Sequence, residues 1–102
     1  MLVRTTTNWI ALAPKDRFAF VATEIKPILE RHRDVSMRFF DSEAFNGHFS
    51  DVILWETSGL LSYQAVVEEL RETRFWDFYF EVREIIPSIE NAYAIQYDVT
   101  AV

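Results

Sequence analysis

The sequence predicts an α+β domain of the ferredoxin-like type, with a four-stranded antiparallel sheet that carries two helices on one face. Three observations lead to this fold class. The chain has 102 residues, a length typical of a single domain. Its strand-like and helix-like segments follow one another in the order β-α-β-β-α-β. Only two glycines and three prolines interrupt them, which favours regular elements over tight turns.

The first three elements occupy the N-terminal part of the chain. We expect the first strand at residues 1–6, where β-branched residues alternate with others. A helix is expected from Pro14 to about Arg31, because apolar residues recur there every three or four positions. Pro27 inside this helix predicts a kink or the loss of one hydrogen bond. The alternating, aromatic segment 35–40 is expected to be the second strand.

The last three elements complete the predicted sheet. The dipeptide Asn46-Gly47 is a strong turn signal in the loop that precedes a third strand at 50–57. A second amphipathic helix is expected at about 59–73, and a fourth strand at 77–86.

The chain is expected to form one domain over residues 1–102, with a core at 1–86 and a C-terminal arm at 87–102. Pro87 ends the last strand, and the arm is expected to form a turn of helix followed by an extended segment.

Alternation along each strand assigns its side chains to one of two faces. We expect Val52 and Leu54 to face the helices, together with Phe78. The side chains expected on the open face are Arg38, Phe40, Asp51, Ile53, Trp55, Tyr79, Glu81, Arg83 and Ile85. Such an apolar face is unfavourable in water, so we expect a homodimer through the open sheet face. A dimer of this kind can enclose an aromatic pocket with a few polar groups, the usual make-up of a small-molecule site.

Four segments carry a resemblance to a known family: "TNWIALAPKDRFAF", "RFFDSEAFNGHFSDVILWET", "VVEELRETRFW" and "YFEVREIIPSIENAY". In order and content they resemble the darcynin family, small bacterial proteins largely without an assigned function. The resemblance covers roughly residues 6–93 and implies a dimeric α+β-barrel-type fold. It implies no established reaction and no catalytic residues.

The candidate site residues come from the strand parity and from the loop between the second and third strands. Asp51, Glu81 and His48 are the candidates for proton transfer, because a buried carboxyl group or a histidine titrates near neutral pH. The candidates for substrate binding are Arg38, Phe40, Trp55, Tyr79 and Arg83. Asp41 and Glu43 would lie at the rim. The same residues also suit structural roles: Glu81 with an arginine as a cross-strand ion pair, Tyr79 in interface packing, and the loop residues in solvent.

The composition excludes several classes of function. A net charge of −6 opposes binding to nucleic acid or to an anionic membrane. The chain has no cysteine, so thiol chemistry is excluded, and its two histidines lack metal-ligand spacing. No glycine-rich phosphate loop and no apolar run long enough for a membrane span occur. We therefore expect a cytoplasmic protein that uses no cofactor and no metal.

Two hypotheses for the function follow. The first is a cofactor-independent enzyme that uses acid–base chemistry on an apolar or aromatic metabolite, by isomerisation, cyclisation or condensation, in secondary metabolism. That reaction class rests on analogy with barrels of this type. The second is a non-catalytic dimeric module, in which the aromatic face serves only for association.

Overall fold

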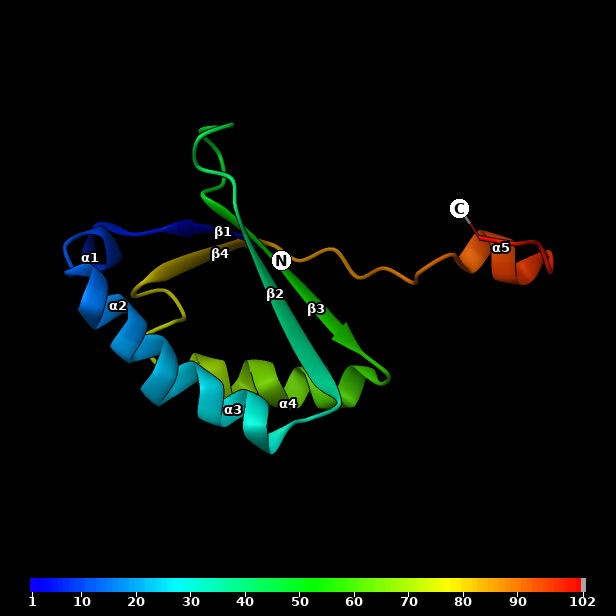
Figure 1. The fold of residues 1–102 in the computed structure, drawn as a ribbon, viewed down its shortest axis with the longest axis horizontal. Coiled ribbons are helices and arrows are strands. Elements are labelled where there is room, and N and C mark those ends of the chain that lie inside the picture. Colours follow the sequence, from blue (N-terminus) through cyan, green and yellow to red (C-terminus); the bar gives the residue numbers. More distant parts are fainter. Residues whose placement is uncertain (102) are drawn as a thin grey trace.

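In the computed structural model, residues 1–101 are described and form an α+β fold around one four-stranded antiparallel sheet, as the sequence predicts. The strands are β1 (Leu2–Thr5), β2 (Val35–Asp41), β3 (Asp51–Thr57) and β4 (Phe80–Glu84). Their order in the sheet is β2-β3-β1-β4, so β2 and β4 are the edges of an open sheet (Figure 1). The long hairpin of β2 and β3 pairs Val35 with Thr57 at one end and Asp41 with Asp51 at the other.

The two long helical segments lie on one side of this sheet (Figure 1). A short helix α1 (Thr7–Ile10), which the sequence did not predict, follows β1. The predicted first helix is continuous through α2 (Pro14–Phe20), a π-helical turn η1 (Val21–Ile25) and α3 (Lys26–Arg31). The second long helix is α4 (Leu60–Arg71), and a short α5 (Ala92–Gln96) lies near the C-terminus. Among residues 1–101, no helix has the length and apolar character needed to cross a bilayer.

The π-helical turn η1 lies just before Pro27. Proline has no backbone N–H, and its ring collides with the carbonyl group four residues earlier, here that of Thr23. The helix therefore widens over Val21–Ile25 instead of breaking, and then returns to α geometry. The hydroxyl group of Thr23 donates a hydrogen bond of 2.8 Å to the carbonyl of Ala19 within the same stretch.

The core lies between the sheet and the two long helical segments. Val3 of β1 and Ile53 of β3 are fully buried at its centre. Ile25 and Ile28 reach them from the first helical segment, and Val66 and Leu70 reach them from α4. Trp9, Phe20 and Tyr79 form an aromatic cluster at one end of the core, with ring centroids 4.9–5.9 Å apart.

The predicted parity of the third strand is wrong. Ile53 is 0% exposed and Trp55 packs against the core, whereas Leu54 is 38% exposed on the other face. The register explains the difference, because Ile53 lies opposite Phe39 and therefore shares the helix-covered face with it. Asp51, two residues before Ile53, also lies on the helix-covered face and not on the open one.

The prediction for Tyr79 and Phe78 is also wrong. Strand β4 begins at Phe80, three residues later than predicted, because residues 74–80 form a turn in which the N–H of Tyr79 donates to the carbonyl of Arg74. Tyr79 is only 6% exposed and lies in the aromatic cluster, while Phe78 is 41% exposed. The strand alternation therefore does not apply to either residue.

The C-terminal arm, residues 85–101, leaves the sheet after β4 and extends away from the body of the molecule (Figure 1). The predicted turn of helix is present as α5, with residues 85–89 before it and residues 99–101 after it in no regular structure. Asn91 begins this helix in the left-handed region, with φ 52°.

Candidate carboxyl site

Three carboxyl groups meet where the β2–β3 hairpin enters its loop. Asp41 ends β2 and lies directly opposite Asp51, the first residue of β3. Glu43 follows in the loop, and one oxygen of each of the three side chains lies within 4.8 Å of the others. Asp41 and Glu43 are exposed, whereas Asp51 is 4% exposed. We call Asp41, Glu43 and Asp51 the carboxyl cluster.

Asp51 is held in place by Ser50. The hydroxyl group of Ser50 donates a hydrogen bond of 2.7 Å to Oδ2 of Asp51 and accepts one of 2.7 Å from the backbone N–H of Thr5. The backbone N–H of Ser50 donates to the carbonyl of Val3 at 3.0 Å. Ser50 is itself buried, so strand β1 fixes the position of the buried carboxyl group through this serine.

The environment of Asp51 raises its pKa to about 6. Burial is the largest cause, because it disfavours the charged carboxylate. The hydrogen bond from Ser50 acts in the opposite direction, and the neighbouring Asp41 and Glu43 raise the pKa further. A carboxyl group with this pKa exists in both protonation states near neutral pH, as a general acid or base requires.

The cluster also has the chemistry of a hard-cation site. Divalent cations such as Ca²⁺ and Mg²⁺ prefer oxygen ligands, and three carboxyl groups converge here. The sequence prediction named no metal ligand, because Asp41 and Asp51 are ten residues apart and meet only through the hairpin register.

Comparison with known proteins identifies the family of the chain. The family model named Darcynin, described as a domain of unknown function, matches residues 1–102. The chain belongs to the darcynin family. A "Darcynin homolog" of Granulibacter bethesdensis is 45% identical over 98 residues, which cover 95% of this chain and 79% of the relative. A "Darcynin homolog" of Streptomyces avermitilis is 41% identical over 98 residues, 95% of this chain and 81% of the relative. "Darcynin 1" of Acinetobacter baumannii is 39% identical over 90 residues, 87% of this chain and 99% of the relative.

The family resemblance expected from the sequence is thus confirmed. The names of these darcynins state no substrate, reaction or partner. No solved structure matches the chain significantly.

In this darcynin, the other predicted site residues do not join the carboxyl cluster. Arg38 and Glu81 are on the open face, each in an ion pair: Arg38 with Glu56 at 3.0 Å, and Glu81 with Arg83 at 3.0 Å. The Arg38 guanidinium group also lies 5.9 Å from the ring centroid of Phe40. Glu81 is exposed, so the dry environment expected for it on the open face is not present in the single chain.

His48 is exposed in the hairpin loop of this darcynin. Its backbone N–H donates to the side-chain oxygen of Asn46 at 3.0 Å, which is the turn predicted from Asn46-Gly47. Its carbonyl accepts a hydrogen bond of 3.0 Å from Arg83, so the loop is tied to β4. The ring of His48 lies beside the ring of Phe49, with 6.4 Å between their centroids.

The residue of the candidate site that sequence reasoning missed is Ser50. Ser50 directly precedes the strand that begins at Asp51, and in the sequence a serine at this position equally well indicates the end of the loop. The signal that could have found it is the pairing of the chain's first strand with the start of the third strand, which buries both residues.

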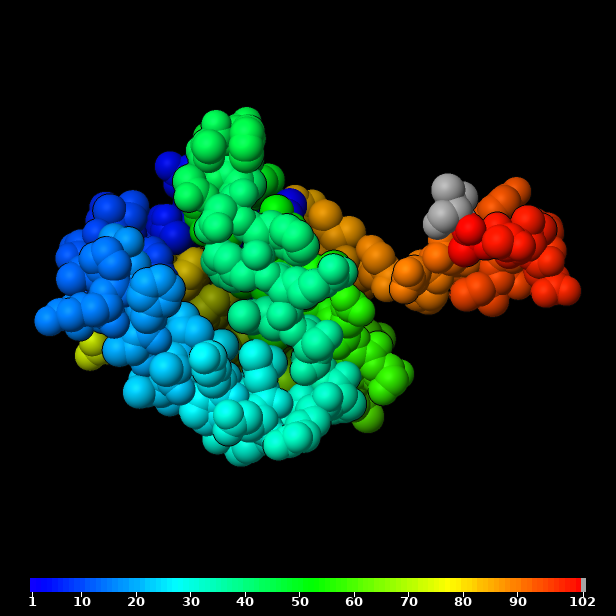
Figure 2. Space-filling view, in the orientation of Figure 1, coloured from blue at the N-terminus to red at the C-terminus, as the bar shows by residue number. Residues whose placement is uncertain are grey.

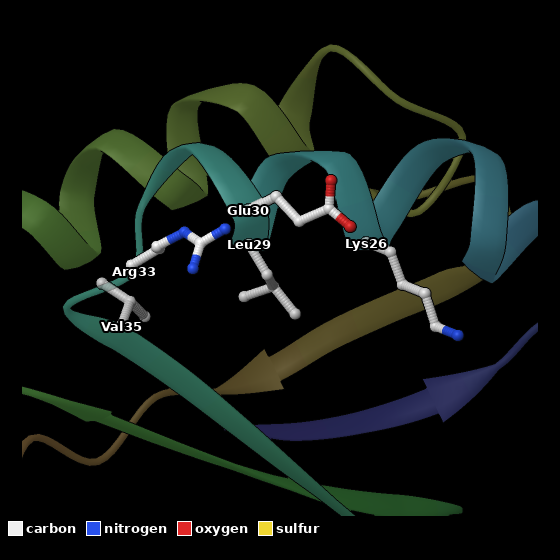
Figure 3. Close-up of a pocket in the computed structure, with 5 residues that line it drawn as sticks. All are labelled: Lys26, Leu29, Glu30, Arg33 and Val35. Carbon is white, nitrogen blue, oxygen red and sulfur yellow. The ribbon is translucent and has the colours of Figure 1, made fainter.

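Two hollows open on the helical side of this darcynin. One, of about 440 Å³, lies between α3 and the start of β2 and is lined by Lys26, Leu29, Glu30, Arg33 and Val35 (Figure 3). The other, of about 460 Å³, is lined by Phe20, Thr23, Glu24, Glu72, Thr73, Arg74 and Tyr79. Over the described residues, neither hollow includes a member of the carboxyl cluster. Tyr79 is the predicted site residue that lines one of them.

Proposed function

We propose that this protein binds a small molecule at the carboxyl cluster and transfers a proton to or from it through Asp51, without a cofactor. The observation that supports this proposal is a carboxyl group only 4% exposed, oriented by Ser50, beside the two exposed carboxyl groups of Asp41 and Glu43. Burying a carboxyl group beside two others is unfavourable for folding, and such arrangements are found where a function requires them.

The proton balance of such a step needs no other reactant. The Asp51 carboxylate removes a proton from a carbon or hydroxyl group that an adjacent carbonyl makes acidic. The resulting acid returns the proton to another atom of the same molecule, which is an isomerisation. In a cyclisation the carbanion bonds to a second carbonyl carbon of the same molecule, and the acid protonates the oxygen of that carbonyl. In a condensation, the third possibility, the carbanion bonds to the carbonyl carbon of a second substrate molecule and the acid form of Asp51 protonates the resulting alkoxide. The new hydroxyl group then leaves with a neighbouring C–H proton as water. Asp41, exposed and opposite Asp51, would exchange the proton with solvent.

The charge of the cluster defines the class of ligand. Two exposed carboxylates repel an anion, so the substrate is uncharged or cationic at the end that approaches Asp51. Phe49 is half-buried in the adjoining loop. An apolar or aromatic metabolite with a carbonyl group, of the kind found in secondary metabolism, fits this setting.

Deuterium exchange tests the proposal directly. Uncharged and cationic aromatic ketones, aldehydes and amino-acid amides are incubated with the protein in D₂O, and NMR follows loss of the acidic C–H signal. We expect at least one compound to exchange faster with the native protein and with Asp16→Asn, a control at an exposed carboxylate in the first turn of α2. Asp51→Asn should exchange no faster than buffer. Equal exchange by Asp51→Asn, or no accelerated compound in the set, contradicts the proposal.

The wider assembly we propose is a ferredoxin-like domain that forms a homodimer through the open sheet face, in the manner of dimeric α+β barrels. The element order and the exposed apolar side chains of Phe40 and Leu54 on that face support it. The lack of cysteine is consistent with a place in the cytoplasm.

The same exposed face favours a second candidate function, a non-catalytic dimeric binding module. In that case Asp51→Asn changes only the stability of the protein, and no compound exchanges protons.

A further inference from the structure

The C-terminal arm, residues 85–101, is separate from the rest of the molecule. The radius of gyration is 15.5 Å, whereas a compact domain of this size has about 13 Å. The arm accounts for the difference: it projects from the body as a separate lobe (Figure 2). The described backbone hydrogen bonds of residues 91–99 all close within the arm, for example from Ile95 N–H to the carbonyl of Asn91 at 3.0 Å.

The arm is apolar and uncovered. Six large apolar side chains on it are more than half exposed: Ile86, Ile89, Tyr93, Ile95, Tyr97 and Val99. Helix α5 has apolar residues all round, with Gln96 its single polar member. Tyr93 and Tyr97 contact each other, at 4.9 Å between ring centroids, but leave most of their surface in water. A helix that is apolar on every side is normally buried against another surface.

The same chain carries a second uncovered apolar surface on the open face of its sheet. Its members come from the three strands β1, β3 and β2 and are Leu2, Val52, Leu54 and Phe40. Phe40 is 48% exposed, and Leu54 is 38% exposed. Strand β4 contributes the ion pair of Glu81 and Arg83 to this face instead. We call Leu2, Phe40, Val52 and Leu54 the apolar half of the open face.

We propose that the arm of one copy of this chain packs on the apolar half of the open face of a second copy, and the second copy returns the contact. This inference rests on the proposed homodimer through the open face and names the segment that makes the contact on its apolar half: the partner's arm covers Phe40 and Leu54 in place of the partner's sheet. Each copy offers one arm and one face, so a two-fold axis satisfies both at once. The arm leaves an edge strand, β4, and runs outward from the body, which directs it to a neighbour (Figure 1).

The chemistry of the two surfaces matches. The six side chains of the arm expose an area of the same order as the about 800 Å² per partner that a standard interface buries. The charged residues of the arm are the acidic Glu90 and Asp98. The open face carries Arg4, whose guanidinium group donates to the carbonyl of Gly47 and can also approach an acidic partner.

Disulfide trapping tests the arrangement, because the native chain has no cysteine. Ile95→Cys and Leu54→Cys are made separately in the full chain, and one of them is isotope-labelled. After mixing and mild oxidation, we expect mass spectrometry to find residues 95 and 54 linked between differently labelled copies. Lys26→Cys, exposed on α3, is the control and should not link to residue 95. Equal linkage to residues 26 and 54, or none to 54, contradicts the proposal.

Sedimentation of the full chain distinguishes the proposed arm exchange from an open-face dimer that forms without it. Tyr93→Asp should shift a dimer to monomer, whereas Thr100→Ala, at an exposed polar residue of the same arm, should not. If Tyr93→Asp stays dimeric while Phe40→Asp dissociates, the open-face dimer is correct and the arm exchange is wrong. If the native chain is a monomer at micromolar concentration, both are wrong. Circular dichroism confirms that each variant keeps its fold.

Discussion

Ser50 donates a hydrogen bond of 2.7 Å to Asp51, its neighbour in the chain, and through the N–H of Thr5 ties that carboxyl group to strand β1. Both residues are buried; Asp51 begins β3, the strand that pairs with β1 and with β2, and Ser50 directly precedes it. A carboxylate in this position destabilises the fold, because its charge is removed from water and lies beside two other carboxyl groups. This cost can be measured.

The stability of the protein should fall as the pH rises through the pKa of Asp51. The folded pKa is about 6 and the ordinary value is 3.8. Well below pH 3.8 the group is protonated in the folded and unfolded states, so burial has no charge penalty. Above pH 6 the folded state must hold a buried carboxylate, which costs on the order of 2–3 kcal/mol. The side chain of Asp51→Asn remains neutral at every pH. In urea denaturation at pH 8, the free energy of unfolding of this variant should therefore exceed that of the native protein by about that amount.

The comparison across pH is its own control. At pH 3 the free energies of unfolding of Asp51→Asn and the native protein should agree to within about 0.5 kcal/mol. Asp16→Asn, at an exposed carboxylate, should follow the native curve at every pH. An Asp51→Asn variant less stable than the native protein at pH 8 would mean that the carboxylate forms a favourable interaction there.

Ser50→Ala should both weaken the fold and raise the pKa of Asp51 above about 6. The substitution leaves the N–H of Thr5 without its acceptor, at a cost of about 1–3 kcal/mol. It also removes the hydrogen bond that favours the charged carboxylate. Carbon-13 NMR of the carboxyl group gives the pKa, and Ser36→Ala, exposed on β2, is the matched control. An unchanged Asp51 titration would show that this hydrogen bond is not retained in solution.

Two neighbouring residues test the orientation of the third strand. Ile53→Ala should cost about 2–5 kcal/mol, because it leaves a cavity at the centre of the core. Leu54→Ala should cost about 1 kcal/mol or less in the free energy of unfolding of the monomer, since this side chain is 38% exposed. Urea denaturation of the two variants, at protein concentrations too low for association, measures both losses. A larger loss of stability for Leu54→Ala than for Ile53→Ala would mean that Leu54, and not Ile53, faces the helices, as the sequence predicted.

The same pair of residues shows where sequence reasoning succeeded and where it failed. Strand β2 alternates clearly, and the prediction that Arg38 and Phe40 face away from the helices is confirmed by the register. Strand β3 has four consecutive apolar residues, Val52 to Trp55, so its sequence contains no period-two signal. Only pairing with β1 and β2 decides which of them enter the core, and that pairing is non-local.

The carboxyl cluster and Tyr79 illustrate two further limits. The burial of Asp51 depends on β1, almost fifty residues earlier, and cannot be inferred from its own neighbours. Tyr79 was assigned by extending strand alternation through a turn that contains neither glycine nor proline. That turn uses Asp77 in the left-handed region, with φ 65°, where glycine would have been the usual signal.

Glu69 connects the two long helical segments and should make a small contribution to stability that depends on pH. It accepts a hydrogen bond of 2.6 Å from Arg31 at the end of α3 and contacts His32, and the bond from Arg31 is the main cause of its lowered pKa. A lowered pKa means that the stabilisation is present above the ordinary value of 4.5 and is lost as the pH falls through the folded value. Because Arg31 is largely exposed, Glu69→Gln should cost no more than about 1 kcal/mol at pH 7. The cost should shrink toward zero at pH 3 and in 1 M salt, as measured by urea denaturation against the exposed neighbour control Glu68→Gln. A loss of several kcal/mol that salt does not reduce would assign Glu69 a buried structural role instead of a screened ion pair.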